Sequence, residues 1–271
     1  KLYPLSANIV TAAYHGGFVT SACGVTIYNG TALPDEYRGN SFTCEPAGNL
    51  VHRDVLVPDG VTFVAKRAYP TNEFLASPDN WFRPVNLAVG PDGALYVCDM
   101  YRKTIEHPEY LPEATRKVTD FESGKTMGRI YRIVAATPNA KHQTSKKFQT
   151  PKRIDLGKAG DAALCDQLNN PNSWWRMTAH RLLLQREIRH TKRYLEKLVL
   201  SAPTPETRVH ALNILNASAS LPEELIEGAL SDTDPGVREH AIRLAESMLP
   251  GTAVFALAEK LRANQPEEFR R

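Results

Sequence analysis

The chain has 271 residues, of which 42% are hydrophobic and 23% are charged. These fractions are those of soluble globular proteins, so they exclude collagen, an extended coiled coil and a wholly disordered chain. The length exceeds one ordinary domain core, which predicts two units. Lys and Arg total 33 against 30 for Asp and Glu, a formal net charge of +3, and neither a basic stripe nor interleaved aromatic residues point to nucleic acid.

Segments that would cross a membrane or carry a haem are also lacking in the sequence. No run of eighteen apolar residues occurs, and the mean hydropathy is -0.36. The first ten residues do not follow the pattern of a secretory signal, and there is no initiator Met. We therefore expect a processed or excised piece of a longer protein. The four cysteines form no Cys-x-x-Cys pair, which excludes a zinc ribbon and a covalent haem attachment site.

The first half of the chain, up to about Val134, consists of short β-branched and aromatic runs separated by Gly, Pro, Asn and Asp, a pattern that predicts antiparallel strands. The first group of predicted strands is 18–28, 40–45, 49–57 and 61–69. The second group is 84–89, 94–99 and 128–134, with a last short strand at 153–156. Two meanders of roughly 45 to 65 residues are typical of propeller blades. Because two blades cannot close a ring, we expect further blades before Lys1.

The second half of the chain has a different composition. Residues 137–160 are polar and Lys-rich and contain Pro138 and Pro151, which predicts a linker that includes the short strand. From Asp161 onward, Leu, Ala, Glu and Arg recur at helical spacing. The predicted organisation is therefore two propeller blades at 1–136, a linker at 137–160 and helical repeats at 161–271.

The helical half repeats itself about every thirty residues. One register aligns Arg176 with Arg208 and Arg238, and the same register aligns three small and three larger apolar residues. The aligned apolar residues are Ala179, Ala211 and Ala241, and Leu182, Ile214 and Leu244. Pairs of helices at this spacing are typical of a HEAT-type solenoid, whose long surface suits a protein partner.

The densest group of unusual residues lies around the second group of strands. Arg83 immediately precedes one predicted strand, and Asp99 and Tyr101 lie at the end of the next. In a propeller these positions lie at the rim of the central channel, where several blades converge on a ligand. The structural alternative is that Asp99 binds a backbone amide and that Arg83 pairs with a neighbouring carboxylate.

Five stretches carry a resemblance to a known family: residues 20–24 (TSACG), 36–40 (EYRGN), 44–53 (CEPAGNLVHR), 81–85 (WFRPV) and 90–107. The chain resembles membrane-bound dehydrogenases of planctomycetes and verrucomicrobia, which are related to sorbosone and soluble glucose dehydrogenases. That family has a six-bladed propeller, then HEAT-like repeats, then a cytochrome c domain. The likeness covers nearly the whole chain, and the order of the parts matches.

This resemblance implies an extracytoplasmic or periplasmic quinoprotein, associated with the membrane through the parent protein. It would oxidise a sugar or another alcohol or aldehyde and pass electrons to a cytochrome c. It implies pyrroloquinoline quinone (PQQ) and calcium in the parent, and haem c in a domain outside this chain. The partners would be the remaining blades, the cytochrome domain and a small sugar or alcohol. The alternative is a noncatalytic propeller and solenoid that binds proteins, since a fold alone does not determine a function.

The same resemblance suggests roles for individual residues. Arg83 and Arg102 are expected to bind a polyanionic cofactor, because guanidinium groups pair with carboxylates, and Tyr101 and Arg129 complete that set. His107 is the expected base, with Asp99 beside it as the second catalytic residue. The alternative for His107 is a loop histidine held by Glu106 or Glu109. Arg129 and Arg132 point to opposite faces of one strand, so only one can face the channel.

Cys23 and Cys44 fall on neighbouring predicted strands of one blade. They can form a cross-strand disulfide in an oxidising compartment, or remain two buried thiols, and the sequence leaves both open. Cys98 and Cys165 are expected in apolar cores. The histidines of the helical half share no metal-ligand spacing, so no metal site is predicted there.

Overall fold

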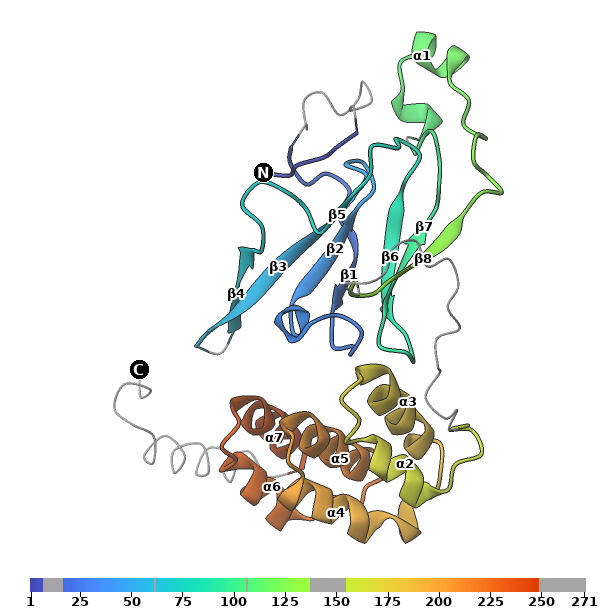
Figure 1. Cartoon of the computed structure of the whole chain (residues 1–271). Helices are drawn as coiled ribbons and strands as arrows, with labels where there is room; N and C mark the ends of the chain where they lie inside the picture. Colours follow the sequence, from blue (N-terminus) through green and yellow to red (C-terminus); the bar gives the residue numbers. More distant parts are fainter. Residues whose placement is uncertain (7–16, 61, 106, 137–154, 249–271) are drawn as a thin grey trace. The chain divides into compact units, whose positions relative to one another are not determined.

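The computed structural model describes residues 1–6, 17–60, 62–105, 107–136 and 155–248. Within these residues the protein has mixed α and β structure, with antiparallel sheets and seven α-helices, in agreement with the predicted β plus α class. The chain divides into two compact units, Lys1–Pro151 and Lys152–Arg271. Figure 1 shows the strands of the first unit and the helices of the second.

The first sheet contains the four strands of the first predicted group, each shorter than predicted or shifted by one or two residues. Its strands are β1 (Cys23–Ile27), β2 (Ser41–Glu45), β3 (Leu50–Asp59), β4 (Thr62–Arg67) and β5 (Leu75–Ala76). They pair antiparallel in the order β1-β2-β3-β4, and β5 pairs with β3. The sequence did not predict β5, because two residues are too few to show an alternating pattern.

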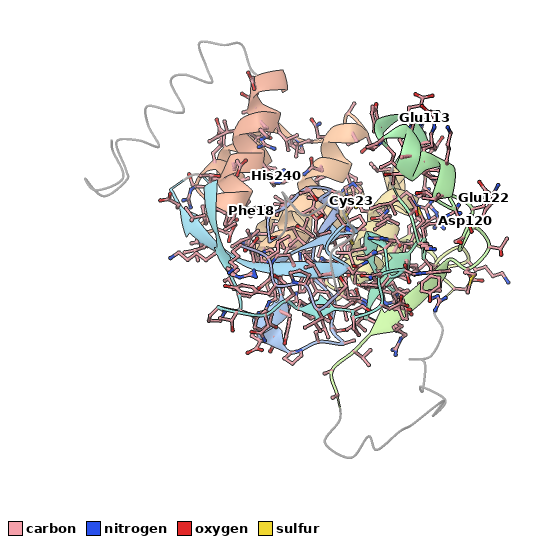
Figure 2. All side chains as sticks on the ribbon, turned by 90° about the horizontal axis from the view of Figure 1, so that it is seen from above. Phe18, Cys23, Glu113, Asp120, Glu122 and His240 are labelled. Atoms are coloured by element: carbon pink, nitrogen blue, oxygen red, sulfur yellow. The ribbon has the colours of Figure 1, made fainter. Side chains whose placement is uncertain are left out.

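The second sheet is formed by β6 (Pro84–Val89), β7 (Leu95–Asp99) and β8 (Arg129–Ile133), antiparallel and in that order. Residues 153 and 154 of the last predicted strand lie outside the described residues, and Leu156 lies in a turn. The long connection from β7 to β8 contains the short helix α1 (Glu113–Val118). Figure 2 shows Glu113, Asp120 and Glu122 projecting outward from this connection.

The two sheets pack together through β1 and β6, which lie side by side (Figure 1). Thr26 Oγ1 on β1 donates a hydrogen bond to the carbonyl oxygen of Leu87 on β6 at 3.1 Å. Gly24 has a φ of 58°, and a Cβ at this position would lie 2.6 Å from Asn86 Cα. Only glycine therefore allows the two backbones to approach so closely.

A hydrophobic core fills the space between the sheets. Its buried members are Tyr28, Leu33, Phe42, Cys44, Val51, Phe82, Leu87, Leu95 and Val97. Tyr28 has its hydroxyl inside the core, where it donates a hydrogen bond to the carbonyl oxygen of Gly93 at 2.7 Å. This packing brings the ends of β6 and β7 next to the β2–β3 turn, where the candidate site lies.

The second unit consists of helices in two layers. The helices are α2 (Asp161–Gln167), α3 (Ser173–Leu184), α4 (Lys192–Ser201), α5 (Pro205–Ala217), α6 (Glu223–Leu230) and α7 (Pro235–Met248). Helices α2, α4 and α6 lie in one layer and α3, α5 and α7 in the other, and each pairs with its sequence neighbour (Figure 1). Leu and Ala side chains from both layers form one core. The predicted helical region beyond Met248 lies outside the described residues.

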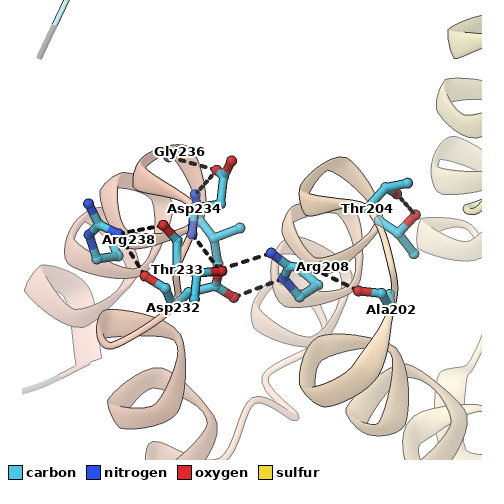
Figure 3. Close-up of polar contacts among 10 residues, drawn as sticks. Ala202, Thr204, Arg208, Asp232, Thr233, Asp234, Gly236 and Arg238 are labelled. Atoms are coloured by element: carbon cyan, nitrogen blue, oxygen red, sulfur yellow. Dashed lines mark hydrogen bonds and ion pairs between the residues drawn. The ribbon is translucent and has the colours of Figure 1, made fainter.

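The three arginines that align in sequence make the same contact in the structure. Each Nη1 donates to a backbone carbonyl six residues earlier: Arg176 to Asn170 at 2.7 Å, Arg208 to Ala202 at 2.8 Å and Arg238 to Asp232 at 2.7 Å. Arg208 also forms a two-pronged ion pair with the Asp232 carboxylate, as Figure 3 shows. The sequence repeat thus corresponds to a structural repeat in which each arginine ties the start of its helix to the preceding loop.

Candidate functional site

The carboxylate of Asp99, at the end of β7, organises the second sheet's edge near the β2–β3 turn. Its Oδ1 accepts hydrogen bonds from the backbone nitrogens of Arg83 and Tyr101, both at 2.8 Å. Asp99 is buried, and its Oδ2 has no hydrogen-bond partner among the described residues. The contact to backbone amides is the structural role that the sequence left as the alternative. The second oxygen is a buried acceptor that suits an additional donor or cation.

The Arg83 side chain binds backbone carbonyls. Its Nη1 donates to Pro46 at 2.8 Å, its Nε to Arg102 at 3.0 Å and its Nη2 to Lys103 at 3.0 Å. The residue is 2% exposed. In this structure the guanidinium therefore joins the first sheet's turn to the segment after β7. Through these bonds Arg83 acts as a positioning residue, and its predicted cofactor contact stays a prediction.

Tyr101 adopts a left-handed backbone conformation with a φ of 49°, which is unusual for a residue with a side chain. Gly124 packs against it, since a Cβ there would lie 2.1 Å from the Tyr101 carbonyl oxygen. The Tyr101 hydroxyl donates to Asp79 Oδ2 at 3.0 Å, and this bond raises the pKa of Tyr101. The loop conformation thus presents the phenol ring at the surface in one orientation.

Two further side chains flank the Tyr101 ring. The Arg129 guanidinium lies 3.6 Å from the ring centre, and the Trp81 ring lies 5.6 Å from it. Arg129 occupies the strand face toward Tyr101, whereas Arg132 pairs with Asp92 at 2.5 Å, so the predicted division between the two faces is observed. Trp81, Tyr101 and Arg129 form a surface group, here called the Tyr101 platform, which offers an aromatic face and a cation.

Arg102 and His107 lie further along the same connection. Among the described residues, the Arg102 side chain makes one long contact, from Nη1 to the Glu122 carbonyl at 3.4 Å. The His107 side chain is 60% exposed and lies 3.9 Å from Glu109, with the Tyr110 ring 5.5 Å away. Its contacts in the described part of the chain are thus within its own loop, and they do not join it to the Tyr101 platform. Glu106 lies outside the described residues.

Cys23 and Cys44 are directly opposite each other in the antiparallel register of β1 and β2. All four cysteines of the chain are free thiols in the structure. Burial raises the pKa of Cys44 to about 12, so its thiol is protonated and reacts slowly at neutral pH. The strand pairing puts the two residues at the separation that a disulfide needs, although the bridge is not formed here.

A polar network on the first sheet was not predicted from the sequence. His52 Nδ1 lies 2.6 Å from Glu73 Oε2, and His52 Nε2 lies 3.1 Å from Asp54 Oδ1. Glu73 also pairs with Arg67 and accepts a hydrogen bond from the Tyr3 amide at 3.0 Å. His52 and Asp54 two residues apart on one strand share a face, which was the available sequence signal. Their partner Glu73 comes from a loop that no pattern links to the strand.

Because the hydrogen bond to Glu73 raises the pKa of His52 against the opposing effect of burial, the network makes stability depend on pH. Its contribution is fully present below the unfolded pKa of about 6.5 and is lost as pH rises through the higher folded pKa. We expect His52→Gln to remove this dependence. Urea unfolding of both proteins across that range tests it, and a constant free-energy difference at all pH values would contradict it.

The described residues contain neither a cluster of metal ligands nor a membrane-spanning helix. In those residues, no group of three or more His, Cys, Asp or Glu side chains could hold a metal ion. None of their helices is both long and apolar enough to cross a membrane.

Comparison with known proteins adds a family but no activity. No curated protein and no solved structure matches the chain. Residues 1–137 match the model of a domain of unknown function (DUF7133), which covers half of the 271 residues and includes the Tyr101 platform. The chain therefore belongs to the DUF7133 family.

Proposed function

We propose that the chain is the closing part of a β-propeller followed by a HEAT-like solenoid, from an extracytoplasmic quinoprotein-like dehydrogenase. Support for the propeller comes from β1 and β6, which lie side by side and each begin a meander. Support for the solenoid comes from the repeated arginine contact in α3, α5 and α7. The parent would oxidise a sugar or another alcohol or aldehyde and pass electrons to a cytochrome c.

The observation that carries the proposal is the Tyr101 platform and the way it is held. Asp99 binds the amides of Arg83 and Tyr101, and the resulting loop turns the Tyr101 ring beneath the Arg129 guanidinium. A planar ring beside an exposed cation fits a flat aromatic cofactor that carries carboxylates. PQQ has this chemistry, so the residues present fit one side of such a cofactor.

The residues of this chain would then bind and orient. Tyr101 would stack on the cofactor ring, and Arg129 would pair with one of its carboxylates, with Arg102 as a second cation nearby. Asp99 and Arg83 would hold the loop that carries these groups. Bound PQQ supplies a two-electron acceptor for an alcohol. The proposal leaves calcium and haem c to parts of the parent outside this chain, and it does not use His107, which lies apart from the platform.

The proposal is tested with the full-length parent protein. Addition of PQQ and calcium is expected to support dye reduction with aldoses or simple alcohols. Arg129→Gln should lower turnover roughly tenfold or more, because it removes a charged contact of about 1.5–3 kcal/mol. Arg116→Gln on α1 removes the same charge away from the platform and should have no effect. Absence of turnover with every aldose and alcohol tested would contradict the proposal.

A noncatalytic protein-binding scaffold is the second candidate. It is favoured by the Arg83 and Asp99 contacts, because the Arg83 side chain donates to backbone carbonyls and Asp99 Oδ1 accepts from backbone amides. If the chain is such a scaffold, the Tyr101 platform would recognise a protein side chain, and the parent protein would not bind PQQ. Equilibrium dialysis of PQQ against the parent protein distinguishes the two candidates without a substrate.

A further inference from the structure

Two histidines of the helical unit face each other between neighbouring helices. His180 on α3 and His210 on α5 have their Nδ1 atoms 3.0 Å apart. Their ring centres are 5.0 Å apart, and the ring planes are inclined by 60°. A neutral imidazole has one N–H and one lone pair, so one Nδ1 donates a hydrogen bond to the other. The two Nδ1 atoms therefore lie in direct contact between α3 and α5.

Burial favours the neutral form of both rings. Burial lowers the pKa of His180, and burial, His180, Arg176 and His240 together lower the pKa of His210 to about 4. Moving one ring proton from Nδ1 to Nε2 gives each Nδ1 a lone pair without loss of a proton from the protein.

The separation of the two nitrogens is compatible with both binding one metal ion. Imidazole nitrogens bind divalent transition metals at about 2.0–2.1 Å. Two nitrogens 3.0 Å apart at such bond lengths subtend an angle of about 94° at the metal. That angle is close to the ~90° of square-planar or octahedral coordination.

We propose that His180 and His210 form a binding site for a divalent transition metal of the Cu²⁺ or Ni²⁺ type, which links α3 to α5. Since the described residues hold no cluster of three such ligands, water would complete the coordination. His240 on α7, labelled in Figure 2, is the next histidine of this unit along the chain and influences His210 electrostatically. The positive charge of Arg176 opposes a bound cation and limits the affinity.

The test is a titration of the whole chain with Cu²⁺, followed by electron paramagnetic resonance. One equivalent should bind with two imidazole nitrogens in its equatorial plane, and binding should raise the unfolding temperature of the helical unit. His180→Gln and His210→Gln should each abolish this signal. His190→Gln is the matched control, because His190 is an exposed histidine of the same unit, and it should bind Cu²⁺ like the unsubstituted chain.

Several results would overturn the proposal. They are the absence of binding to the unsubstituted chain, a signal with fewer than two imidazole nitrogens, and equal binding by the His180→Gln/His210→Gln double variant. Loss of the signal in only one single variant would also contradict a site that needs both rings. The nitrogen count is measured on the unsubstituted chain, so it decides the question even if a variant fails to fold. None of these measurements depends on the proposed dehydrogenase activity.

Discussion

Replacing Arg83 with alanine is expected to destabilise the sheet unit by about 3–5 kcal/mol. The substitution leaves the buried carbonyl of Pro46 and the partly buried contacts at the carbonyls of Arg102 and Lys103 without their donor. Each lost partner costs about 1–3 kcal/mol when water cannot replace it. The turn after β2 and the segment after β7 would then separate, and the Tyr101 platform would lose its support.

Two further variants are compared with Arg83→Ala in the same stability measurement. Arg83→Lys keeps the charge but cannot reach three carbonyls, so it should recover only part of the loss. Arg102→Ala is the control, since its side chain makes one contact at 3.4 Å within the described part of the chain, and it should change stability by less than ~1 kcal/mol. Urea unfolding gives all three values. If Arg83→Ala were no more destabilising than Arg102→Ala, the positioning role would be wrong and the predicted cofactor contact would be favoured.

Oxidation of Cys23 and Cys44 to a disulfide is expected to stabilise the sheet unit by about 3 kcal/mol. The bridge would close a loop of about twenty residues. The lower entropy of the unfolded chain raises its free energy by about 3 kcal/mol at 25 °C. With oxidised glutathione as the oxidant, the partly exposed Cys23 thiolate would attack the glutathione disulfide and release one reduced glutathione. Cys44 would then displace the second glutathione from the mixed disulfide.

Mass spectrometry and thermal unfolding measure this result together. The oxidised chain should lose two hydrogens, give a peptide that contains both Cys23 and Cys44, and unfold at a higher temperature. Because burial raises the pKa of both thiols, the reaction should be slow near neutral pH and faster in alkali. Cys98→Ala should leave it unchanged, whereas Cys44→Ala should abolish it. A bridge from Cys23 to Cys98, or a bridge without stabilisation, would contradict the prediction.

The candidate site could be predicted in position but not in its contacts. Turn residues and alternation located the ends of β6 and β7, so Arg83, Asp99 and Tyr101 were expected near one another. The backbone-amide contact of Asp99 was one of its two predicted alternatives, whereas the partners of Arg83 were not predictable. Arg83 reaches Pro46, which is 37 residues away in sequence, and such a pairing depends on how the two sheets pack.

The amino-acid sequence by itself determined the strands of both sheets apart from β5, the change from strands to helices and the thirty-residue arginine repeat. These features depend on local alternation, turn residues and helical spacing, which act between residues close in the chain. Only the tertiary structure decided that Glu73 meets His52, that His180 meets His210 and that Arg83 binds carbonyls. Those contacts join segments far apart in sequence, and their geometry results from packing that no local pattern encodes.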